Sequence, residues 1–391
     1  DCNLSYADTG AVTFREKSGL HLVNAQNVTV VNITAFDNEN GGIRLDSCNN
    51  ITITGCHLID SGRPESVGVE GDGIILRSSS DVLIEDCVMM ENRHAGVMIG
   101  SEFSTTVDCI NITIKDCQIS GGSHGIHTSY SNRVHGLNIE NCTISDFSYA
   151  GFWMNDGVGD VKQTGWIIRN LTVYDGDMSS TMGAMMLKFL TGALLEGVEI
   201  RQVDAGHDEG ILDLRNCDNM TITDSFFHDN VGTMIQTSYW SYDCQNITIM
   251  DSTITNCTSK GIWVDEGSVD ITISGMAIDS VLGTNGKGIY VAQSSRVTIQ
   301  DCTITNNSQY GIYVHSYAHH VDIRGCNISN NGDSINDYGV YLYTFSNNVT
   351  VVNNTFTNNN GASAMYDTAH IQAYDAGDNN SWNDSEGGNR W

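Results

Sequence analysis

The sequence predicts an all-β chain that winds as one right-handed parallel β-helix of about thirteen coils. Three observations predict this fold class. An apolar segment recurs along the 391 residues at a nearly constant spacing, and a second apolar segment that begins with glycine follows most copies. The turns are supplied by Gly, Asn and Asp, in a chain with 40 glycines and one proline. Repeats of this length are typical of solenoids, in which each coil packs on its neighbours.

The first segment of each repeat reads Asn-Ile-Thr-Ile or a close variant. Successive copies begin 23 residues apart at Asn27 and Asn50, and 27 residues apart at Asn219 and Asn246. Apolar and polar residues alternate within it, as in a strand that turns one face to a core. The copies begin at Asn27, Asn50, Asp81, Asn111, Asn219, Asn246, Asp270, Arg296 and Asn348, with weaker ones near Gly136, Gly165, Gly192 and His320.

The second segment reads Gly-Ile-Tyr-Val in its clearest copies, and a short apolar piece such as Cys117-Gln-Ile lies between the two segments. Two or three short strands per coil indicate coils that pair in parallel with the next coil. We therefore expect a single domain with coils over 27–378. Residues 1–26 form an N-terminal cap and residues 379–391 a C-terminal cap in this prediction, because an open terminal coil is an aggregation-prone edge. The second segments begin at Gly42, Gly73, Gly96, Gly125, Gly151, Gly261, Gly288, Gly311 and Gly339.

Charge and composition restrict the partners and the compartment. The formal net charge is −29, from 18 Lys+Arg and 47 Asp+Glu, so the surface repels nucleic acids and disfavours a polyuronate substrate. No apolar run is long enough to span a membrane. We read Asp1 as a mature N-terminus left after removal of an export signal. The 12 cysteines fit an oxidising compartment, and the protein is expected to be extracellular or on the cell surface.

Asparagines in the first segment create glycosylation sequons, but the repeat itself also explains them. Six asparagines at this phase are interpreted as a ladder at a turn, which generates Asn-x-Thr by coincidence. Sequons outside that phase are the better candidates for N-glycosylation. The ladder consists of Asn27, Asn50, Asn111, Asn219, Asn246 and Asn348, and the glycosylation candidates are Asn3, Asn256, Asn306 and Asn383.

Cysteines also recur at fixed phases of the repeat. In-register cysteines one coil apart have Cα atoms about 4.8 Å apart, within disulfide range, although their parallel Cβ vectors are unfavourable. Two disulfides are the candidates, Cys217–Cys244 and Cys302–Cys326. A ladder of buried free thiols is the equal alternative.

The repeated Asn-Ile-Thr-Ile and Gly-Ile-Tyr-Val segments resemble the pectate-lyase-like β-helix superfamily. They resemble in particular the carbohydrate-binding and sugar-hydrolase repeat proteins of bacterial and archaeal surfaces. The likeness covers nearly the whole chain, and the ending Asn380-Ser-Trp-Asn is similar to segments that close such modules in archaeal surface proteins. The superfamily includes lyases, epimerases, hydrolases, adhesins and structural proteins, so the resemblance implies the fold and leaves the activity open.

A catalytic centre is only weakly indicated. A lyase or epimerase needs a base, a proton donor and a cation or Ca²⁺ that stabilises an enolate. The candidates for these roles are Arg44, Arg77, His127 and Glu70 in the first coils. The motifs of polygalacturonase-like hydrolases, mannuronan epimerases and pectate lyases are absent, so solvated polar positions explain these residues better. Asp- and Asn-rich turns can bind Ca²⁺ but lack the EF-hand spacing, and we expect no metal site and no cofactor.

An outward apolar stripe is the most prominent surface feature that the pattern predicts. It includes Trp153, Trp263, Tyr290, Tyr313 and Tyr341, together with Ile75, Met98, His127, Met185, Leu212 and Met234. A loop of the same chain, a stacked glycan or a second subunit can cover such a stripe.

We favour the second subunit. The sequence then predicts a secreted cell-surface structural protein that self-associates into a homo-oligomer or polymer of an envelope or extracellular assembly. The alternative is a polysaccharide-active enzyme (a lyase, epimerase or hydrolase) or a glycan-binding module that uses the same face. The sequence leans against an enzyme, because no catalytic motif is present.

Overall fold

Three short parallel strands make up each coil in the computed structural model, which confirms the predicted class. The structure describes residues 2–5, 18–62, 71–100, 108–128, 133–154, 162–177, 183–205, 210–238, 242–334, 336–359, 372–384 and 387–391. The chain forms two compact units, Asp1–Leu194 and Leu195–Trp391. The number of coils differs slightly from the predicted thirteen.

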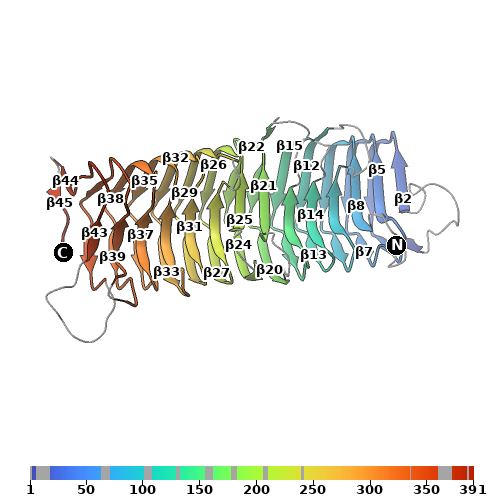
Figure 1. Ribbon diagram of the computed structural model, residues 1–391. Helices are drawn as coiled ribbons and strands as arrows, with labels where there is room; N and C mark the ends of the chain where they lie inside the picture. Colours follow the sequence, from blue (N-terminus) through green and yellow to red (C-terminus); the bar gives the residue numbers. More distant parts are fainter. Residues whose placement is uncertain are drawn as a thin grey trace. The chain divides into compact units, whose positions relative to one another are not determined.

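The first unit contains three parallel faces, which we call sheets A, B and C, and whose strands follow one another coil by coil (Figure 1). Sheet A consists of β1 (Cys2–Ser5), β4 (Ile33–Phe36), β7 (His57–Ile59), β10 (Val88–Met90), β13 (Gln118–Ser120), β16 (Thr143–Ser145) and β20 (Thr172–Asp177). Sheet B consists of β2 (Ser18–Val23), β5 (Gly41–Asp46), β8 (Asp72–Arg77), β11 (Ala95–Ile99), β14 (His124–Thr128), β17 (Ala150–Met154) and β21 (Met185–Lys188). Sheet C consists of β3 (Gln26–Val31), β6 (Asn49–Thr54), β9 (Ser80–Glu85), β12 (Cys109–Lys115), β15 (Val134–Glu140) and β19 (Ile167–Arg169). Two further short strands, β18 (Gln163–Thr164) and β22 (Leu190–Thr191), pair with each other.

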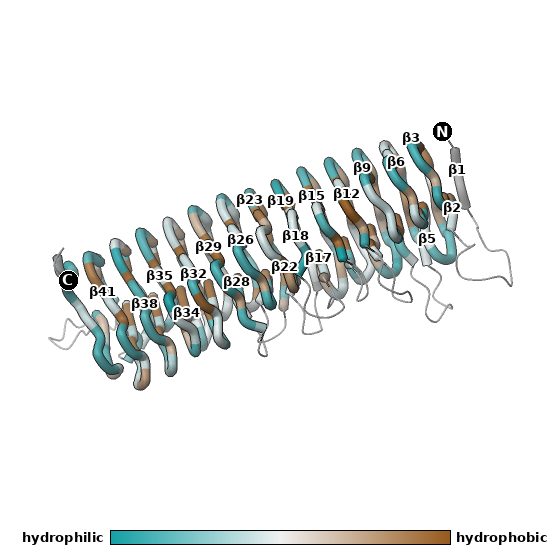
Figure 2. Tube along the Cα trace, turned by 90° about the horizontal axis from the view of Figure 1, so that it is seen from above, coloured by the Kyte–Doolittle hydropathy of each residue, from teal (hydrophilic) through white to brown (hydrophobic). Residues whose placement is uncertain are grey.

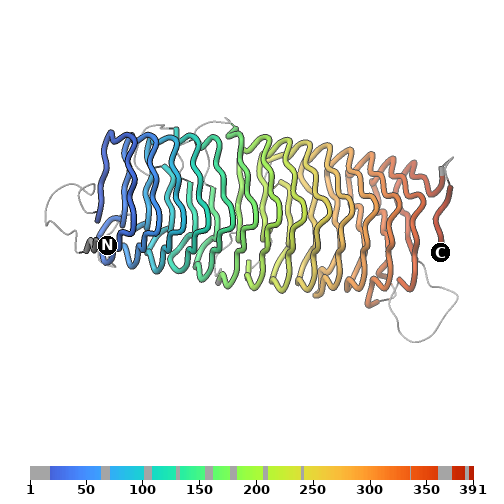
Figure 3. The backbone as a smooth tube through the Cα atoms, turned by 180° about the vertical axis from the view of Figure 1, so that it is seen from behind, coloured from blue at the N-terminus to red at the C-terminus, as the bar shows by residue number. Residues whose placement is uncertain are grey.

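The second unit repeats the same three faces, and its coils also follow one another in chain order (Figure 3). Sheet A consists of β24 (Glu199–Asp204), β27 (Phe226–Asn230), β30 (Thr253–Cys257), β33 (Ala277–Val281), β36 (Thr303–Thr305), β39 (Asn327–Ser329) and β42 (Thr355–Thr357). Sheet B consists of β25 (Gly210–Arg215), β28 (Thr233–Thr237), β31 (Lys260–Val264), β34 (Lys287–Val291), β37 (Tyr310–Val314), β40 (Val340–Leu342) and β43 (Ala373–Asp375). Sheet C consists of β26 (Asp218–Thr223), β29 (Gln245–Met250), β32 (Val269–Ser274), β35 (Ser295–Gln300), β38 (His319–Arg324) and β41 (Thr350–Val352). The short strand β23 (Leu194–Glu196) lies at the boundary of the units, and β44 (Asn383–Asp384) pairs antiparallel with β45 (Gly387–Gly388).

The core of each unit is a set of stacked aliphatic side chains from the inward positions of the strands. In sheet C of the second unit, Ile249 pairs in register with Ile273, which pairs with Ile299, and all three are fully buried. Ile53 and Ile114 occupy the same position in the first unit and are also fully buried. The predicted inward register is therefore confirmed, and the alternation of hydrophobic and hydrophilic residues along the coils is visible in Figure 2.

The asparagines of the repeat occupy a turn in the left-handed backbone conformation. Asn50 and Asn246 have φ angles of 54° and 53°, a conformation that Asn, Asp and Gly adopt more readily than other residues. The side-chain Nδ2 of Asn50 donates to Asn27 Oδ1 at 2.7 Å, and that of Asn246 donates to Asn219 Oδ1 at 2.7 Å. The predicted asparagine ladder is therefore present at these coils.

Two of the glycosylation candidates belong to a second set of such turns. Asn256 and Asn306 are exposed, but their Nδ2 atoms donate to Asp229 Oδ1 and Asp279 Oδ1 respectively. Asn383 is exposed in β44, and Asn3 lies in β1, where its side chain is outside the described part of the structure. Glycosylation of all four stays a prediction.

Several cysteines lie in register one coil apart, without a bond between neighbours. The cysteines whose side chains the structure describes are all free and buried, including the four candidates for disulfides, Cys217, Cys244, Cys302 and Cys326. Cys217 and Cys244 directly precede the paired residues Asp218 and Gln245, so they lie one coil apart as predicted. Because parallel strands point the two Cβ atoms the same way, the thiols stack and the predicted disulfides Cys217–Cys244 and Cys302–Cys326 are not formed.

The C-terminal end of the chain carries aromatic contacts. Trp391 stacks on Phe356 of β42 with 4.7 Å between ring centroids, and Trp382 donates a hydrogen bond from Nε1 to Asp375 Oδ2 at 2.9 Å. The cap boundaries at residues 26 and 379 stay predictions. Among the described residues, no helix has the length and apolar character that crossing a membrane requires.

Candidate functional site

The outward column of sheet B is fixed by strand register. In the first unit the in-register residues are His21, Arg44, Ile75, Met98, His127, Trp153 and Met186. In the second unit they are Asp213, Gln236, Trp263, Tyr290, Tyr313, Tyr341 and Tyr374. The predicted members Met185, Leu212 and Met234 are therefore wrong by one or two residues, and Met186, Asp213 and Gln236 occupy their positions. A one-residue slip moves a side chain to the opposite face of the sheet.

This column is not a continuous exposed stripe. Ile75 and Met98 are fully buried, and Asp213 and Gln236 are polar and also buried. The ion pair between Arg215 and Asp213 occupies part of that stretch, with Arg215 Nε 2.8 Å from Asp213 Oδ2. The predicted continuity is wrong: among the described residues of this column in the second unit, the accessible aromatic rings begin at β31.

We call this group of rings the aromatic face. Its central column is Trp263, Tyr290, Tyr313, Tyr341 and Tyr374, with centroid distances of 5.9, 5.4, 5.0 and 5.5 Å between successive rings. Tyr374 is 41% exposed and the other four are half-buried. Further rings beside the column belong to Tyr310, Tyr338, His315 and Tyr343.

Two lysines flank the aromatic face at one edge. Lys260 and Lys287 occupy paired positions in β31 and β34. Lys260 Nζ lies 3.9 Å from the Trp263 ring centroid, a cation–π contact, and Lys287 Nζ lies 5.8 Å from the Tyr313 centroid. Lys287 Nζ also donates to Gln309 Oε1 at 2.7 Å. Burial, together with the charge of Lys260, lowers the pKa of Lys287 to about 8.

Further titratable groups lie in the central column of the aromatic face and on the side opposite the lysines. Burial raises the pKa of the Asp265 carboxyl to about 6 and the pKa of the Tyr290 phenol to about 12. His315, 5.7 Å from the Tyr290 ring, has a pKa lowered by burial and by the charge of Lys287. Cations, a carboxyl and phenols therefore line the same row of rings.

The predicted catalytic candidates do not form one site. Arg44 is buried and donates from Nε to both oxygens of Asp46 at 3.2 and 3.1 Å, so it serves an ion pair. Burial alone would raise the pKa of Asp46, but the hydrogen bonds and charges of Arg44 and His21 lower it. Arg77 of β8 lies in register with Asp46 of the neighbouring strand β5. Strands β8 and β11 separate Arg44 from His127. Glu70 lies outside the described residues.

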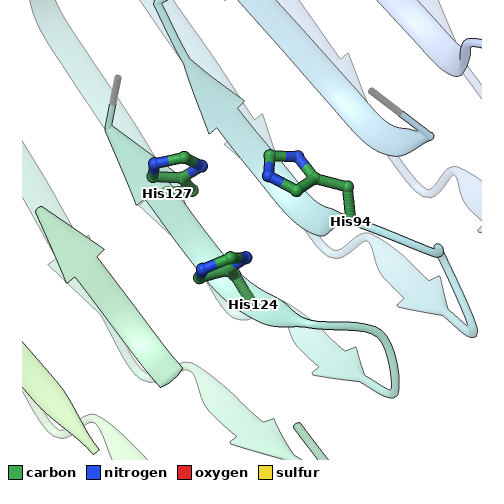
Figure 4. Close-up of side chains that lie close together, drawn as sticks. All are labelled: His94, His124 and His127. Carbon is green, nitrogen blue, oxygen red and sulfur yellow. The ribbon is translucent and has the colours of Figure 1, made fainter. Parts of the chain in front are cut away.

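His127 belongs instead to a cluster of three imidazoles in the first unit, two of them buried and one half-buried. His94, directly before β11, lies near His124 and His127 of β14, and the potential ligand atoms of all three lie within 4.8 Å of one another (Figure 4). Trp153, a predicted member of the stripe, stacks on His124 and His127 with centroid distances of 4.8 Å to each. Burial lowers the pKa of His124 to about 3 and the pKa of His127 well below its ordinary value, with a further contribution from neighbouring imidazoles. A neutral buried imidazole of this kind is a weak base.

A buried carboxylate orients this histidine cluster. Asp72, the first residue of β8, is fully buried and its Oδ1 accepts hydrogen bonds from His94 Nδ1 at 2.8 Å and from the Ala95 amide at 3.0 Å. The sequence patterns assigned no role to His94, His124 or Asp72. The signal was the concentration of three histidines within two successive repeats, next to the second-segment glycines Gly96 and Gly125.

With the geometry established, the class of protein is a right-handed parallel β-helix. A sequence family described as right handed beta helix region matches residues 107–278 and 279–381, which is more than half of the chain. The chain belongs to this right-handed β-helix family. A second family, described as periplasmic copper-binding protein (NosD), matches residues 3–176. No curated protein sequence matches the chain.

The solved structures that are similar to this chain have low sequence identity to it. The A-module of the mannuronan C-5 epimerase AlgE6 from Azotobacter vinelandii has a TM-score of 0.57 and 13% identity, over 88% of this chain and 89% of that one. A double mutant of the periplasmic alginate epimerase AlgG has a TM-score of 0.41 and 12% identity, over 90% and 77%. The tailspike protein gp49 of Pseudomonas phage LKA1 has a TM-score of 0.37 and 14% identity, over 84% and 48%. The first of these similarities supports the fold alone.

Proposed function

We propose that the protein is an extracytoplasmic β-helix that binds a polysaccharide along the aromatic face of its second unit. The observation that carries the proposal is the in-register column of five accessible or half-buried rings on successive strands of sheet B. Parallel strands repeat at about 4.8 Å, so the rings form a linear platform that suits an extended chain of sugar rings. Aromatic rings offer a large, rigid contact area with a polar edge, which fits the apolar faces and hydroxyls of sugars.

The two lysines define the class of glycan. Lys260 and Lys287 place positive charge beside the rings in a chain of net charge −29. Two neighbouring cations at one edge of the platform attract an anionic group, so the proposed ligand carries carboxylate or sulfate groups. The overall negative charge, which argued against a polyuronate substrate, acts against such a ligand only where no local cation offsets it.

Self-association through the same face was the function that the sequence favoured. Its premise was an apolar stripe along most of the coils, and the buried Ile75, Met98, Asp213 and Gln236 interrupt that stripe. A local platform with charged edges matches a glycan better than an apolar seam between subunits. The two functions make different predictions for the same variants.

An extracytoplasmic location is part of the proposal. It is supported by the match of residues 3–176 to a family described as periplasmic. A polysaccharide ligand also suits this compartment, where extended acidic glycans are accessible to a protein that binds them along one face.

The direct test removes two rings of the platform. Trp263→Ala combined with Tyr313→Ala should weaken binding to an acidic polysaccharide by about tenfold or more, since stacked rings contribute about 0.5–1.5 kcal/mol each beyond their buried area. Affinity electrophoresis over alginate, pectate and a neutral glucan measures the effect. Phe226→Ala is the matched control, because Phe226 is an exposed aromatic ring of sheet A in the same unit.

Particle size distinguishes the alternatives in the same experiment. If the double variant binds every glycan like the parent while sedimenting as a smaller particle, the face is a subunit contact and the glycan proposal is overturned.

A further inference from the structure

We infer that His94, His124 and His127 form a binding site for one divalent transition-metal ion of the kind that imidazole ligands prefer, such as Zn²⁺. The three side chains converge in the first unit, and their potential donor atoms lie within 4.8 Å of one another (Figure 4). This inference concerns other residues than the aromatic face and does not depend on glycan binding.

The ring nitrogens of two histidines have no partner within the described part of the chain. His124 and His127 are 4% and 1% exposed, and neither Nδ1 nor Nε2 of either ring makes a hydrogen bond to another described residue. Each neutral imidazole carries one N–H donor and one acceptor nitrogen, and leaving both buried and unpaired costs free energy. A metal ion that accepts the lone pair of each ring removes the acceptor part of that cost.

Asp72 orients the third histidine, His94, through a hydrogen bond. Its Oδ1 accepts a hydrogen bond from the N–H of His94 Nδ1 at 2.8 Å, which places the lone pair of His94 on Nε2. The Ala95 amide fixes the same carboxylate oxygen at 3.0 Å, and Asp72 is fully buried. A carboxylate that orients a metal-binding histidine through its second nitrogen is a common feature of zinc sites.

Stacking alone explains less of this arrangement. Trp153 lies against both rings at 4.8 Å with an interplanar angle of 9°, which holds the two imidazole planes parallel. An aliphatic pair would pack against the indole without any unpaired nitrogen, whereas the histidines add four buried polar atoms. The indole therefore packs against one side of both imidazole rings.

The donor set selects the class of ion. Three neutral nitrogen ligands without a carboxylate in direct contact suit Zn²⁺ and Cu²⁺, and do not suit Ca²⁺ or Mg²⁺, which take oxygen ligands. Zn–N distances of about 2.0–2.1 Å bring the donors around one ion closer than 4.8 Å. Small rotations of the side chains are therefore required, and the fourth position of a tetrahedral ion stays open to water or another ligand.

The test is zinc binding to the full chain after removal of metals with a chelator. Isothermal titration with ZnCl₂, and elemental analysis after dialysis, should show one Zn²⁺ per chain at this site. His124→Gln combined with His127→Gln should abolish that binding, and Asp72→Asn should weaken it by roughly 10–100-fold. His319→Gln combined with His320→Gln is the matched control, because these adjacent histidines of the second unit are exposed.

Failure of the parent to bind Zn²⁺ or Cu²⁺, or equal binding by the double variant, overturns the inference. If that double variant does not fold, His94→Gln decides, because His94 is only half-buried: an unchanged zinc affinity overturns the site and a loss supports it. Excess Ca²⁺ should not displace the zinc. Acidic-glycan binding measured on the metal-free protein separates a failure of this site from a failure of the proposed function.

Discussion

Lys287 is the side chain whose protonation state matters most for the proposed ligand. It is 7% exposed, it lies beside Lys260, and its ammonium group is held by Gln309. Desolvation and the second cation both favour the neutral amine, so the pKa falls to about 8 and the proton is lost near that pH instead of above pH 10. Asp337 acts in the opposite direction and partly restores the charge.

Binding of an acidic glycan should therefore weaken as pH rises from about 7 to about 9, the window around the lowered pKa of Lys287. The charged lysine attracts the ligand below its pKa and the neutral amine does not, so the affinity falls through this window. Lys287→Arg should keep its affinity across the window, because the guanidinium stays charged. Titration calorimetry at several pH values measures the profile.

Lys287→Gln supplies the second arm of that experiment. It should bind weakly at all these pH values and show a flat profile, and a neutral glucan should show no pH dependence with either protein. A parent protein whose affinity for the acidic glycan is constant across the same window would contradict the role of this lysine.

Some residues of the aromatic face could be predicted and others could not. Trp263, Tyr290, Tyr313 and Tyr341 follow the Gly-Ile or Gly-Val start of each second segment, where alternation directs them outward. Lys260 and Lys287 come directly before the glycine, at the start of the strand. At this position the alternation of inward and outward residues does not predict the direction of a side chain. Only the structure shows that both lysines lie beside the rings.

At the scale of elements, the three-strand coil rests on the alternation of inward and outward residues. In β29 the side chains of Ile247 and Ile249 are fully buried, while Thr248 between them is half-buried on the outer face. The same order recurs in β32 with Ile271, Thr272 and Ile273, paired residue by residue. Two adjacent residues of one strand therefore lie in different environments, one in the buried core and the other on the outer face.

Ile249→Asp tests this register. A carboxylate in the aliphatic stack has no described polar partner, so the free energy of unfolding should fall by at least about 3 kcal/mol. Urea denaturation followed by circular dichroism measures the change. Thr248→Asp is the neighbouring control on the outer face and should cost less than about 1 kcal/mol. Similar losses for both variants would show that the register is wrong.

The elements also show where sequence patterns fail. Gly210 pairs with Thr233, and the register places Thr233 level with Lys260 in the next coil. In that coil the glycine, Gly261, comes one residue later. The glycine that marks the start of the strand is therefore displaced by one residue in β25. Counting from it placed Leu212 outward, whereas Leu212 pairs with the inward Ile235 and Asp213 points out. Because the glycine is displaced, the sequence pattern predicted an apolar surface residue at a position where the molecule has an ion pair.

At the scale of the whole molecule, the fold class followed from periodicity because a solenoid repeats its constraints in every coil. Every coil repeats the same two features, an Asn or Asp at the left-handed turn, such as Asn50 and Asp81, and isoleucines at the inward positions. The residues of a functional site, in contrast, occur only once in the sequence. The approach of His94 to His124, and of Asp72 to His94, joins neighbouring coils at positions that no periodic pattern predicts.

We propose that an acidic polysaccharide lies along the aromatic face of the second unit. A crystal structure of the protein with a bound oligosaccharide of alginate or pectate would locate this ligand. We predict sugar rings stacked on Trp263, Tyr290 and Tyr313, with an acidic group within hydrogen-bond distance of Lys260 or Lys287. An oligosaccharide bound on another sheet, with these rings uncontacted, would contradict the account.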